Sequence, residues 1–356
     1  MSTVNKPTLI LSNDPKSASE GPIATSKMYS VDWLRAFGIF LVVLGHSKVD
    51  LIVVRKLIFA FHMPLFFFLS GMVLKPSRLK STLAETARHL WATLIWPYAV
   101  FALIGFAAWF LVLRHTGQSP KAEPSPSQAA LAIFYGSGSG DYTMQPIVLW
   151  FFPCLTVCHL MARISFSRPF YISLAIMLGL AVAGYAGRTM VLPWEIETAC
   201  VAIGFMFLGF ITAQRPQFHN GIQRLPWPFA LVVFALSMMI AYFNDTVDLR
   251  SSQFGNPALY YLASIGSIFG LLGLALRLPS INWVRRISES TIVVFPLHHL
   301  GFTFLSGIYV VLLHLPLDFR TKPLVAIAGS MGIVAGLTWV APPIKRLLGL
   351  GGRRAG

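Results

Sequence analysis

Residues 31–48 read VDWLRAFGIFLVVLGHSK, and residues 57–75 read LIFAFHMPLFFFLSGMVLK. Each stretch is long enough for an α-helix to cross a hydrocarbon layer about 30 Å thick, because a helix rises about 1.5 Å per residue. Both stretches nevertheless contain ionisable residues, namely Arg35, His46 and His62. An ionisable residue inside a membrane span is costly and is therefore a functional candidate. The two stretches predict neighbouring membrane helices that carry a functional site.

Long apolar stretches of this kind recur along the whole chain. Of its 356 residues, 55% are hydrophobic and 12% are charged, and the mean hydropathy is +0.67. An ordinary soluble domain has about 25% charged residues, so this chain has too little polar surface to be one. We expect an all-α, polytopic bundle of about ten transmembrane helices embedded in a lipid bilayer. The predicted spans lie near residues 31–48, 57–75, 89–113, 146–163, 170–188, 196–213, 226–243, 258–277, 290–314 and 322–341.

The distribution of Lys and Arg predicts the orientation of the bundle. If the N-terminus is inside, the inner segments hold 18 of the 28 basic residues and the outer segments hold 9. Basic residues concentrate on the cytoplasmic side of membrane proteins, so both termini are predicted to be cytoplasmic. The net charge of +15 is then explained by orientation, and it requires no nucleic acid partner.

The chain divides into one large domain and two tails. Residues 1–27 are mostly polar with scattered prolines and predict a disordered cytoplasmic tail. Residues 28–345 form the predicted transmembrane domain, and residues 346–356 form a basic cytoplasmic tail. The long loop near residues 114–145 contains three prolines and a Gly-Ser run, so it is either a lid over an outer site or, as we favour, a linker.

Arg35 and His46 are predicted to lie on one face of the first helix. They are 11 residues apart, which is three turns with about 20° left over, and their axial separation is about 16 Å. Arg35 then lies toward the cytoplasm and His46 toward the outside. This suits a reaction with an anionic donor inside and an acceptor outside. The alternatives are an interfacial Arg35 paired with Asp32 and an interfacial His46.

His62 adds a second candidate base to the same region. A short loop joins the first two spans, so His46 and His62 should lie at similar depth, and Pro64 can bend the helix beside them. His298, in the ninth span, either lines the same cavity or bonds to a neighbouring helix. A metal site would need ligands beyond His46 and His62, so none is predicted. Glu195 and Glu197 lie at the outer start of the sixth span. We expect them to mark a solvated helix end, and contacts with sugar hydroxyls are the alternative.

Four motifs resemble those of the acyltransferase-3 family of membrane acyltransferases, which includes exopolysaccharide acetyltransferases and fucose 4-O-acetylase-like proteins. Arg35 and His46, with ten residues between them, resemble its R-x10-H motif, and FHMPLFFFLSG (residues 61–71) resembles its second-span signature. SESTIVVFPLH (residues 288–298) and LWFF (residues 149–152) resemble later family patterns. The resemblance covers most of the chain.

The resemblance implies transfer of an acetyl group from cytoplasmic acetyl-CoA to a hydroxyl of a cell-surface or exopolysaccharide sugar, at the bacterial inner membrane. His46 matches the family's catalytic histidine and Arg35 its essential arginine near the donor path. We expect His46 to act as the general base on the hydroxyl, with a neighbour, His62 or Ser70, orienting it or stabilising the oxyanion; a transient acyl-histidine is the alternative. No bound cofactor is expected, and polysaccharide assembly machinery is a possible partner.

The donor-binding residues are less completely matched. The family often has an R-x-x-R element after the second span, whereas this chain has separate cations there. We expect the donor and substrate contacts to come from Asp32, Ser70, Arg78, Lys80, Arg88 and His298. The alternative function is a transporter or flippase of glycans or lipid-linked sugars, which would also place Arg and His within the membrane. A non-catalytic scaffold would leave the shared face of Arg35 and His46 unexplained.

Overall fold

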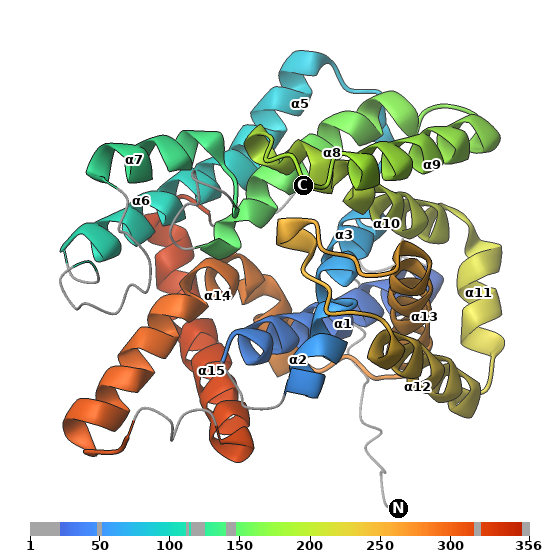
Figure 1. The fold of residues 1–356 in the computed structure, drawn as a ribbon. Helices are drawn as coiled ribbons and strands as arrows, with labels where there is room; N and C mark the ends of the chain where they lie inside the picture. The colour runs from blue at the N-terminus through green and yellow to red at the C-terminus, as the bar shows by residue number, and fades with distance from the viewer. Residues whose placement is uncertain are drawn as a thin grey trace, which may run out of the picture.

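The computed structural model describes residues 22–47, 52–111, 114, 125–139, 147–316 and 322–350. In these ranges the chain consists of helices and their connections, and an isolated β-bridge pairs Asp248 with Gln253. The helices pack against one another as a bundle (Figure 1). The predicted all-α membrane bundle is confirmed.

The longer helices are connected by short helical turns and loops. Their bounds are α1 (Pro22–His46), α2 (Ile52–Phe59), α3 (His62–Met72), α4 (Pro76–Leu79), α5 (Leu83–Leu90), α6 (Trp96–Leu111), α7 (Pro126–Tyr135), α8 (Phe151–Ser165), α9 (Phe170–Ala186), α10 (Ile196–Gln214), α11 (Pro216–Arg224), α12 (Trp227–Phe243), α13 (Pro257–Ala275), α14 (Asn282–Gly307) and α15 (Pro323–Leu347). Two π-helical turns extend this set, Trp91–Ile95 between α5 and α6 and Ile308–Leu312 after α14.

Each of the ten predicted spans falls on a helix. Among the described residues, seven helical stretches are long and apolar enough to cross a membrane. An eighth arises if α11 and α12, which are bent by 97°, are one broken span. The two remaining predicted spans fall on α1 and on the 17-residue α9. The helix α1 begins at Pro22, inside the predicted tail 1–27, while residues 1–21 and 351–356 lie outside the described residues.

The second span is broken between α2 and α3 at Ala60 and Phe61. Pro64 has no N–H, so it cannot bond to the carbonyl of Ala60 four residues earlier. The hydroxyl of Ser264, on α13, lies 2.7 Å from this carbonyl oxygen and 2.7 Å from that of Tyr260, so the two carbonyls share its proton. A neighbouring helix thus supplies the donor that proline removes, as membrane helices with internal prolines require. The break brings α3 to start at His62.

The helices α3 and α10 meet through glycines on both sides. A Cβ atom added at Gly71 would overlap the backbone carbonyl of Met206, and one added at Gly209 would overlap that of Phe68. Small residues let membrane helices approach closely, where dispersion contacts hold them together. The core around this contact contains fully buried aromatic side chains, including Phe67 and Phe205.

At each end of the bundle, hydrogen bonds join segments that are distant in the sequence. Their pairing agrees with helices that cross the bundle in alternating directions. We call the end where α1 begins the inner face and the opposite end the outer face. At the inner face, the Trp33 indole donates to the Pro279 carbonyl at 2.9 Å; at the outer face, Lys56 donates to the Tyr242 carbonyl at 2.8 Å. Further bonds join Arg163 to Ser81 at the inner face and Arg250 to Gly138 at the outer face.

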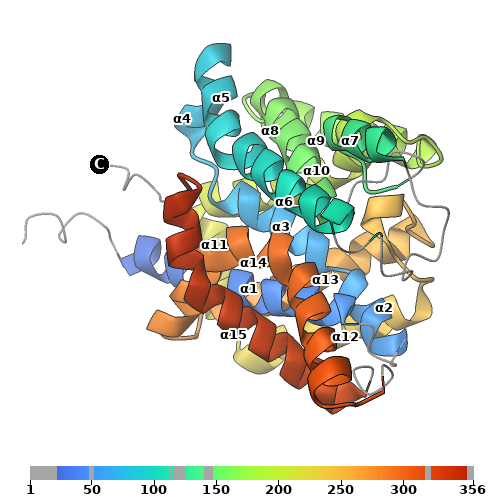
Figure 2. The same ribbon diagram turned by 90° about the vertical axis from the view of Figure 1, so that its left-hand side faces the viewer.

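The last helix ends at the same face at which the first one begins. The Lys345 ammonium, in the final turn of α15, donates to the Glu289 carbonyl near the start of α14 at 3.1 Å. Figure 2 shows the beginning of α1 and the end of α15 on the same side of the bundle. A chain that crosses the bundle an even number of times begins and ends at the same face.

Candidate active site

Arg35 and Asp32 lie at the inner end of α1, beside the start of α14. Asp32 Oδ1 accepts a hydrogen bond of 2.6 Å from the Ser288 hydroxyl. Among the described residues, no ion pair within 4.0 Å joins Asp32 to Arg35. The carboxylate therefore fixes α1 against α14, and Arg35 is half-buried on the same helix without a close ion pair to it.

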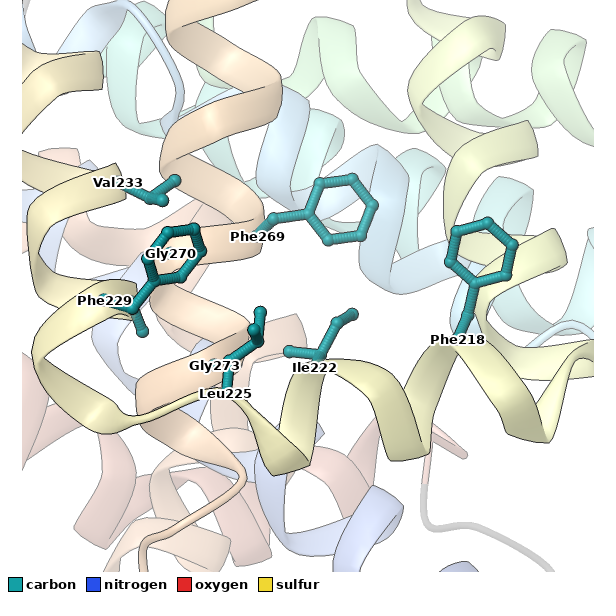
Figure 3. A pocket seen from close by; sticks show the side chains of 9 residues that line it. Phe218, Ile222, Leu225, Phe229, Val233, Phe269, Gly270 and Gly273 are labelled. Atoms are coloured by element: carbon teal, nitrogen blue, oxygen red, sulfur yellow. The ribbon is translucent and has the colours of Figure 1, made fainter.

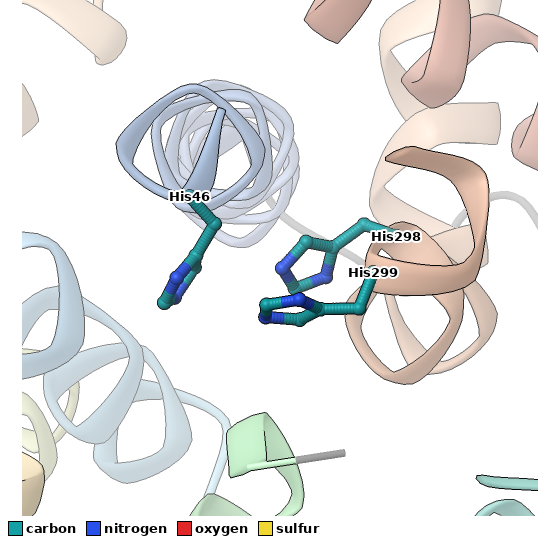
Figure 4. A group of neighbouring side chains, drawn as sticks. All are labelled: His46, His298 and His299. Atoms are coloured by element: carbon teal, nitrogen blue, oxygen red, sulfur yellow. The ribbon is translucent and has the colours of Figure 1, made fainter. Parts of the chain in front are cut away.

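His46, in the last turn of α1, faces two histidines of α14. Its ring centroid lies 5.3 Å from that of His298 and 5.1 Å from that of His299, and these two are 4.7 Å apart. One ring nitrogen from each residue lies within 4.8 Å of the others. Figure 4 shows the three rings converging from two helices. The structure thus brings His298 to His46 and adds His299, which the sequence analysis did not assign to the site.

The orientation of His298 is fixed by its own helix. Its Nδ1 lies 2.6 Å from the Phe295 carbonyl oxygen, and a carbonyl can only accept, so Nδ1 carries the proton. The Nε2 atom then has a free lone pair. His298 is completely buried, and its Nε2 has no hydrogen-bond partner among the described residues. A buried polar atom left unpaired costs about 1–3 kcal/mol, so this lone pair calls for a functional explanation.

His62 approaches the same region through Phe59. The Phe59 ring lies 4.9 Å from the His62 ring and 5.8 Å from the His46 ring, measured between centroids. His62 is 3% exposed, and its Nδ1 lies 2.9 Å from the Ile58 carbonyl, so it also presents Nε2 as the basic nitrogen. The Arg55 guanidinium lies 5.1 Å from the Phe59 ring centroid and covers this aromatic contact.

The other predicted site residues lie away from the histidines. The Ser70 hydroxyl donates to the Phe66 carbonyl at 2.9 Å within α3, and it lies about 12 Å from His62 along the helix axis. Arg78 in α4, Lys80 after it and Arg88 in α5 are exposed cations at the inner face. They are placed to meet an anion from that side, and they take no part in the outer cluster.

Glu195 is a polar residue that sequence analysis placed wrongly, because it is completely buried rather than at a solvated helix end. Its Oε1 accepts from the Ser137 hydroxyl at 3.0 Å and from the Gly138 N–H at 2.7 Å, and its Oε2 accepts from Thr198 at 2.8 Å. Trp194 and Glu195 both have positive φ, 60° and 56°, a strained conformation for such residues. The sequence pattern, an acidic residue directly before an apolar helix, does not predict that Glu195 is buried.

The Gly-Ser segment of residues 136–139 is held at the outer face by these bonds. The Arg250 guanidinium donates to the Gly138 carbonyl at 2.7 Å and pairs with Asp248 at 2.9 Å. A Cβ at Gly138 would press on the Arg250 side chain, and Gly136 adopts a positive φ of 70° to end α7. In the described part of the loop, this segment is a fixed wall of the outer face and not a free linker.

An apolar groove of about 280 Å³ lies elsewhere, between α11, α12 and α13 (Figure 3). Its walls carry only hydrocarbon and aromatic groups, together with two glycines. They are Phe218, Ile222, Leu225, Phe229, Ala230, Val233, Phe269, Gly270 and Gly273. With no titratable side chain, this groove offers no group for acid–base chemistry.

The site as a whole combines three functional features on two helices, α1 and α14. A half-buried cation lies at the inner end of α1, a group of imidazoles lies at its outer end, and His298 presents an unshared lone pair to that group. Neutral imidazoles of this kind can accept a proton from a hydroxyl or bind a transition-metal ion.

Comparison with known proteins identifies the family. Residues 28–341 match the model of the acyltransferase-3 family, described as an acyltransferase domain. No curated protein and no solved structure matched the chain. The match covers most of the sequence, including both helices that carry the histidines. The chain therefore belongs to the acyltransferase-3 family and is a multi-pass membrane acyltransferase.

Proposed function

We propose that the protein is an O-acetyltransferase of the bacterial inner membrane. It takes an acetyl group from cytoplasmic acetyl-CoA and transfers it to a hydroxyl of a cell-surface or exopolysaccharide sugar, free or linked to a lipid. The observation that carries this proposal is the convergence of His46 with the buried His298 at the outer end of the helix that holds Arg35 at its inner end.

The chemistry requires one base and a low-dielectric environment. A nitrogen of His46 takes the proton from the sugar hydroxyl, and the hydroxyl oxygen attacks the carbonyl carbon of the thioester. The resulting tetrahedral oxyanion collapses, the C–S bond breaks, and the thiolate of CoA leaves and takes up the proton from His46. His298 supports His46 in this scheme, because its ring lies 5.3 Å from that of His46 and its unshared Nε2 lone pair favours positive charge on the protonated His46.

The donor is proposed to enter from the inner face. CoA is an anion with phosphate groups, and Arg and Lys bind phosphates through charge-assisted hydrogen bonds. The exposed cations Arg78, Lys80 and Arg88 lie at that face, and Arg35 lies deeper on α1, about 16 Å from His46 along the axis. These cations provide a charged route toward the histidines, and Asp32 positions the inner end of α1 through its bond with Ser288.

The acceptor is proposed to bind at the outer face, where polysaccharide assembly machinery would deliver it. The fixed segment 136–139 and Arg250 line this face. Both termini then lie in the cytoplasm, in agreement with the excess of basic residues at the inner face. The flippase alternative predicts no covalent change in the sugar.

The direct test is to replace the proposed base. His46→Ala should lower acetyl transfer from labelled acetyl-CoA to cell-envelope glycans by about 10²–10⁴-fold, because a general base contributes that much. The readout is alkali-labile label on the glycan fraction. His314→Ala, which removes an exposed histidine, is the matched control and should retain full activity. Full activity of His46→Ala at normal protein levels would refute the base assignment, and absence of label with the wild-type protein would refute acetyl transfer.

A further inference from the structure

His46, His298 and His299 form a close group of three imidazoles. Among the described residues, these three side chains are close enough together to ligate one metal ion. One ring nitrogen of each lies within 4.8 Å of the others. His46 and His299 are half-buried and His298 is fully buried, so the group has a partly accessible side. The group joins α1 to α14, two helices far apart in sequence.

The spacing of the nitrogens can be compared with that of a metal-bound set. A tetrahedral Zn²⁺ ion with Zn–N distances of 2.0–2.1 Å has ligand nitrogens roughly 3.3 Å apart. A bound ion would therefore draw the three ligand nitrogens, which lie within 4.8 Å of one another, closer together. In Figure 4 the rings of His298 and His299 both extend from α14 toward His46.

His298 also has the second hydrogen bond that metal-ligating histidines share. Such residues almost always donate their other ring N–H to a carboxylate, a backbone carbonyl or water, which fixes the tautomer and directs the lone pair at the metal. The Nδ1 of His298 makes this bond to the Phe295 carbonyl at 2.6 Å, and its Nε2 is buried without a hydrogen-bond partner. An ordinary packed histidine would be expected to satisfy both nitrogens.

The ligand chemistry selects the kind of ion. Three neutral imidazoles without a carboxylate or thiolate suit borderline divalent ions such as Zn²⁺, and they disfavour Mg²⁺ and Ca²⁺, which prefer oxygen. Three protein ligands leave a fourth tetrahedral position for water or a hydroxyl. We propose that His46, His298 and His299 form a binding site for a divalent transition-metal ion of the Zn²⁺ class.

The proposed site goes beyond acyl transfer and does not depend on it. A bound ion occupies the lone pair of His46, so the ion-bound form is a state in which His46 is not free to act as a base. The two properties are measured separately, one by binding and the other by label transfer. Failure of either proposal leaves the other intact.

The test uses the full-length protein in detergent, stripped with a chelator and titrated with Zn²⁺ alone. The wild-type protein should bind about one Zn²⁺ ion per chain, and it should take up Co²⁺ with the visible absorption of a four-coordinate nitrogen-rich site. His46→Ala, His298→Ala and His299→Ala should each weaken binding by about tenfold or more, since each removes a ligand. Gel filtration and the thermal midpoint establish that each variant is folded.

The control is His314→Ala, which removes an exposed histidine and should bind like the wild type. The proposal is overturned if the wild-type protein binds no more Zn²⁺ than the triple variant that lacks His46, His298 and His299. It is also overturned if folded single variants keep the wild-type affinity and Co²⁺ spectrum. A wild-type protein that binds no Zn²⁺ overturns the proposal even if a variant fails to fold.

Discussion

Glu195 shows how much a single buried side chain organises at the residue scale. Its two oxygens accept three hydrogen bonds, from Ser137, Gly138 and Thr198, and they anchor an outer loop to the start of α10. The backbone at Glu195 is in the left-handed region, which the surrounding bonds must stabilise. The cost of burying this carboxylate is offset by the hydrogen bonds that its two oxygens accept.

Replacing Glu195 with Ala leaves these donors without their acceptor. We expect Glu195→Ala to destabilise the protein by about 2–4 kcal/mol, since each orphaned buried donor costs about 1–3 kcal/mol and such losses do not simply add. Glu195→Gln, which keeps one carbonyl oxygen, should cost less. Unfolding in detergent, followed by circular dichroism, measures the difference. Glu289→Ala removes an exposed carboxylate as a control, and equal loss in both variants would contradict the burial argument.

The site was partly predictable at this scale. The 11-residue spacing of Arg35 and His46 is a local property of one helix, so their shared face followed from periodicity alone. The contact of His46 with His299 was not predictable, because it depends on which helix lies beside α1. The burial of Glu195 was missed for the same reason, because its carboxylate accepts hydrogen bonds from residues 57 and 58 positions away.

At the scale of elements, the contact between α3 and α10 depends on the absence of side chains at two positions. We expect Gly209→Ala to cost about 1–3 kcal/mol, because its new methyl group would overlap the Phe68 carbonyl and force the helices apart. Gly204→Ala is the matched control on the same helix, as a Cβ there would have no neighbour within 4 Å. The thermal midpoint in detergent measures both. A Gly209→Ala protein as stable as Gly204→Ala would show that the close approach is unimportant.

The break between α2 and α3 supports a second prediction about elements. Ser264→Ala removes the donor to the Ala60 carbonyl and should cost about 0.6–1.7 kcal/mol, the range for bonds between membrane helices. Pro64→Ala restores a backbone N–H within α3, so the cost of Ser264→Ala should shrink in that background. A double-mutant cycle of unfolding free energies measures this coupling.

A control for that cycle comes from Ser330, a buried serine whose hydroxyl donates to the Ala326 carbonyl of its own helix. Ser330→Ala should cost little in either background. Additive effects of Ser264→Ala and Pro64→Ala would argue against a shared carbonyl.

The whole molecule has two chemically different ends, and its orientation is testable. In a protein whose three cysteines are replaced by Ala, Lys80→Cys should react with a membrane-impermeant maleimide only after cells are permeabilised. Ser127→Cys, in the exposed start of α7, should react in intact cells, because the predicted orientation places it outside. Gel shift of the labelled protein is the readout. The reverse pattern would invert the bundle and place His46 at the cytoplasmic side.

The sequence by itself determined the all-α class and the positions of the apolar helices, and it predicted ten spans of alternating direction with Arg35 and His46 on one face of the first. These properties follow from local hydropathy, helical periodicity and the charge of the loops. Only the tertiary structure decided which helices pack together, and hence that α14 brings His298 and His299 to His46, that α10 lies against α3, and that residues 136–139 close on Glu195. Lipid is as apolar as a buried side chain, so hydropathy marks a span but not its neighbours. The partners are selected by shape and by hydrogen bonds between distant segments, and these exist only in the folded bundle.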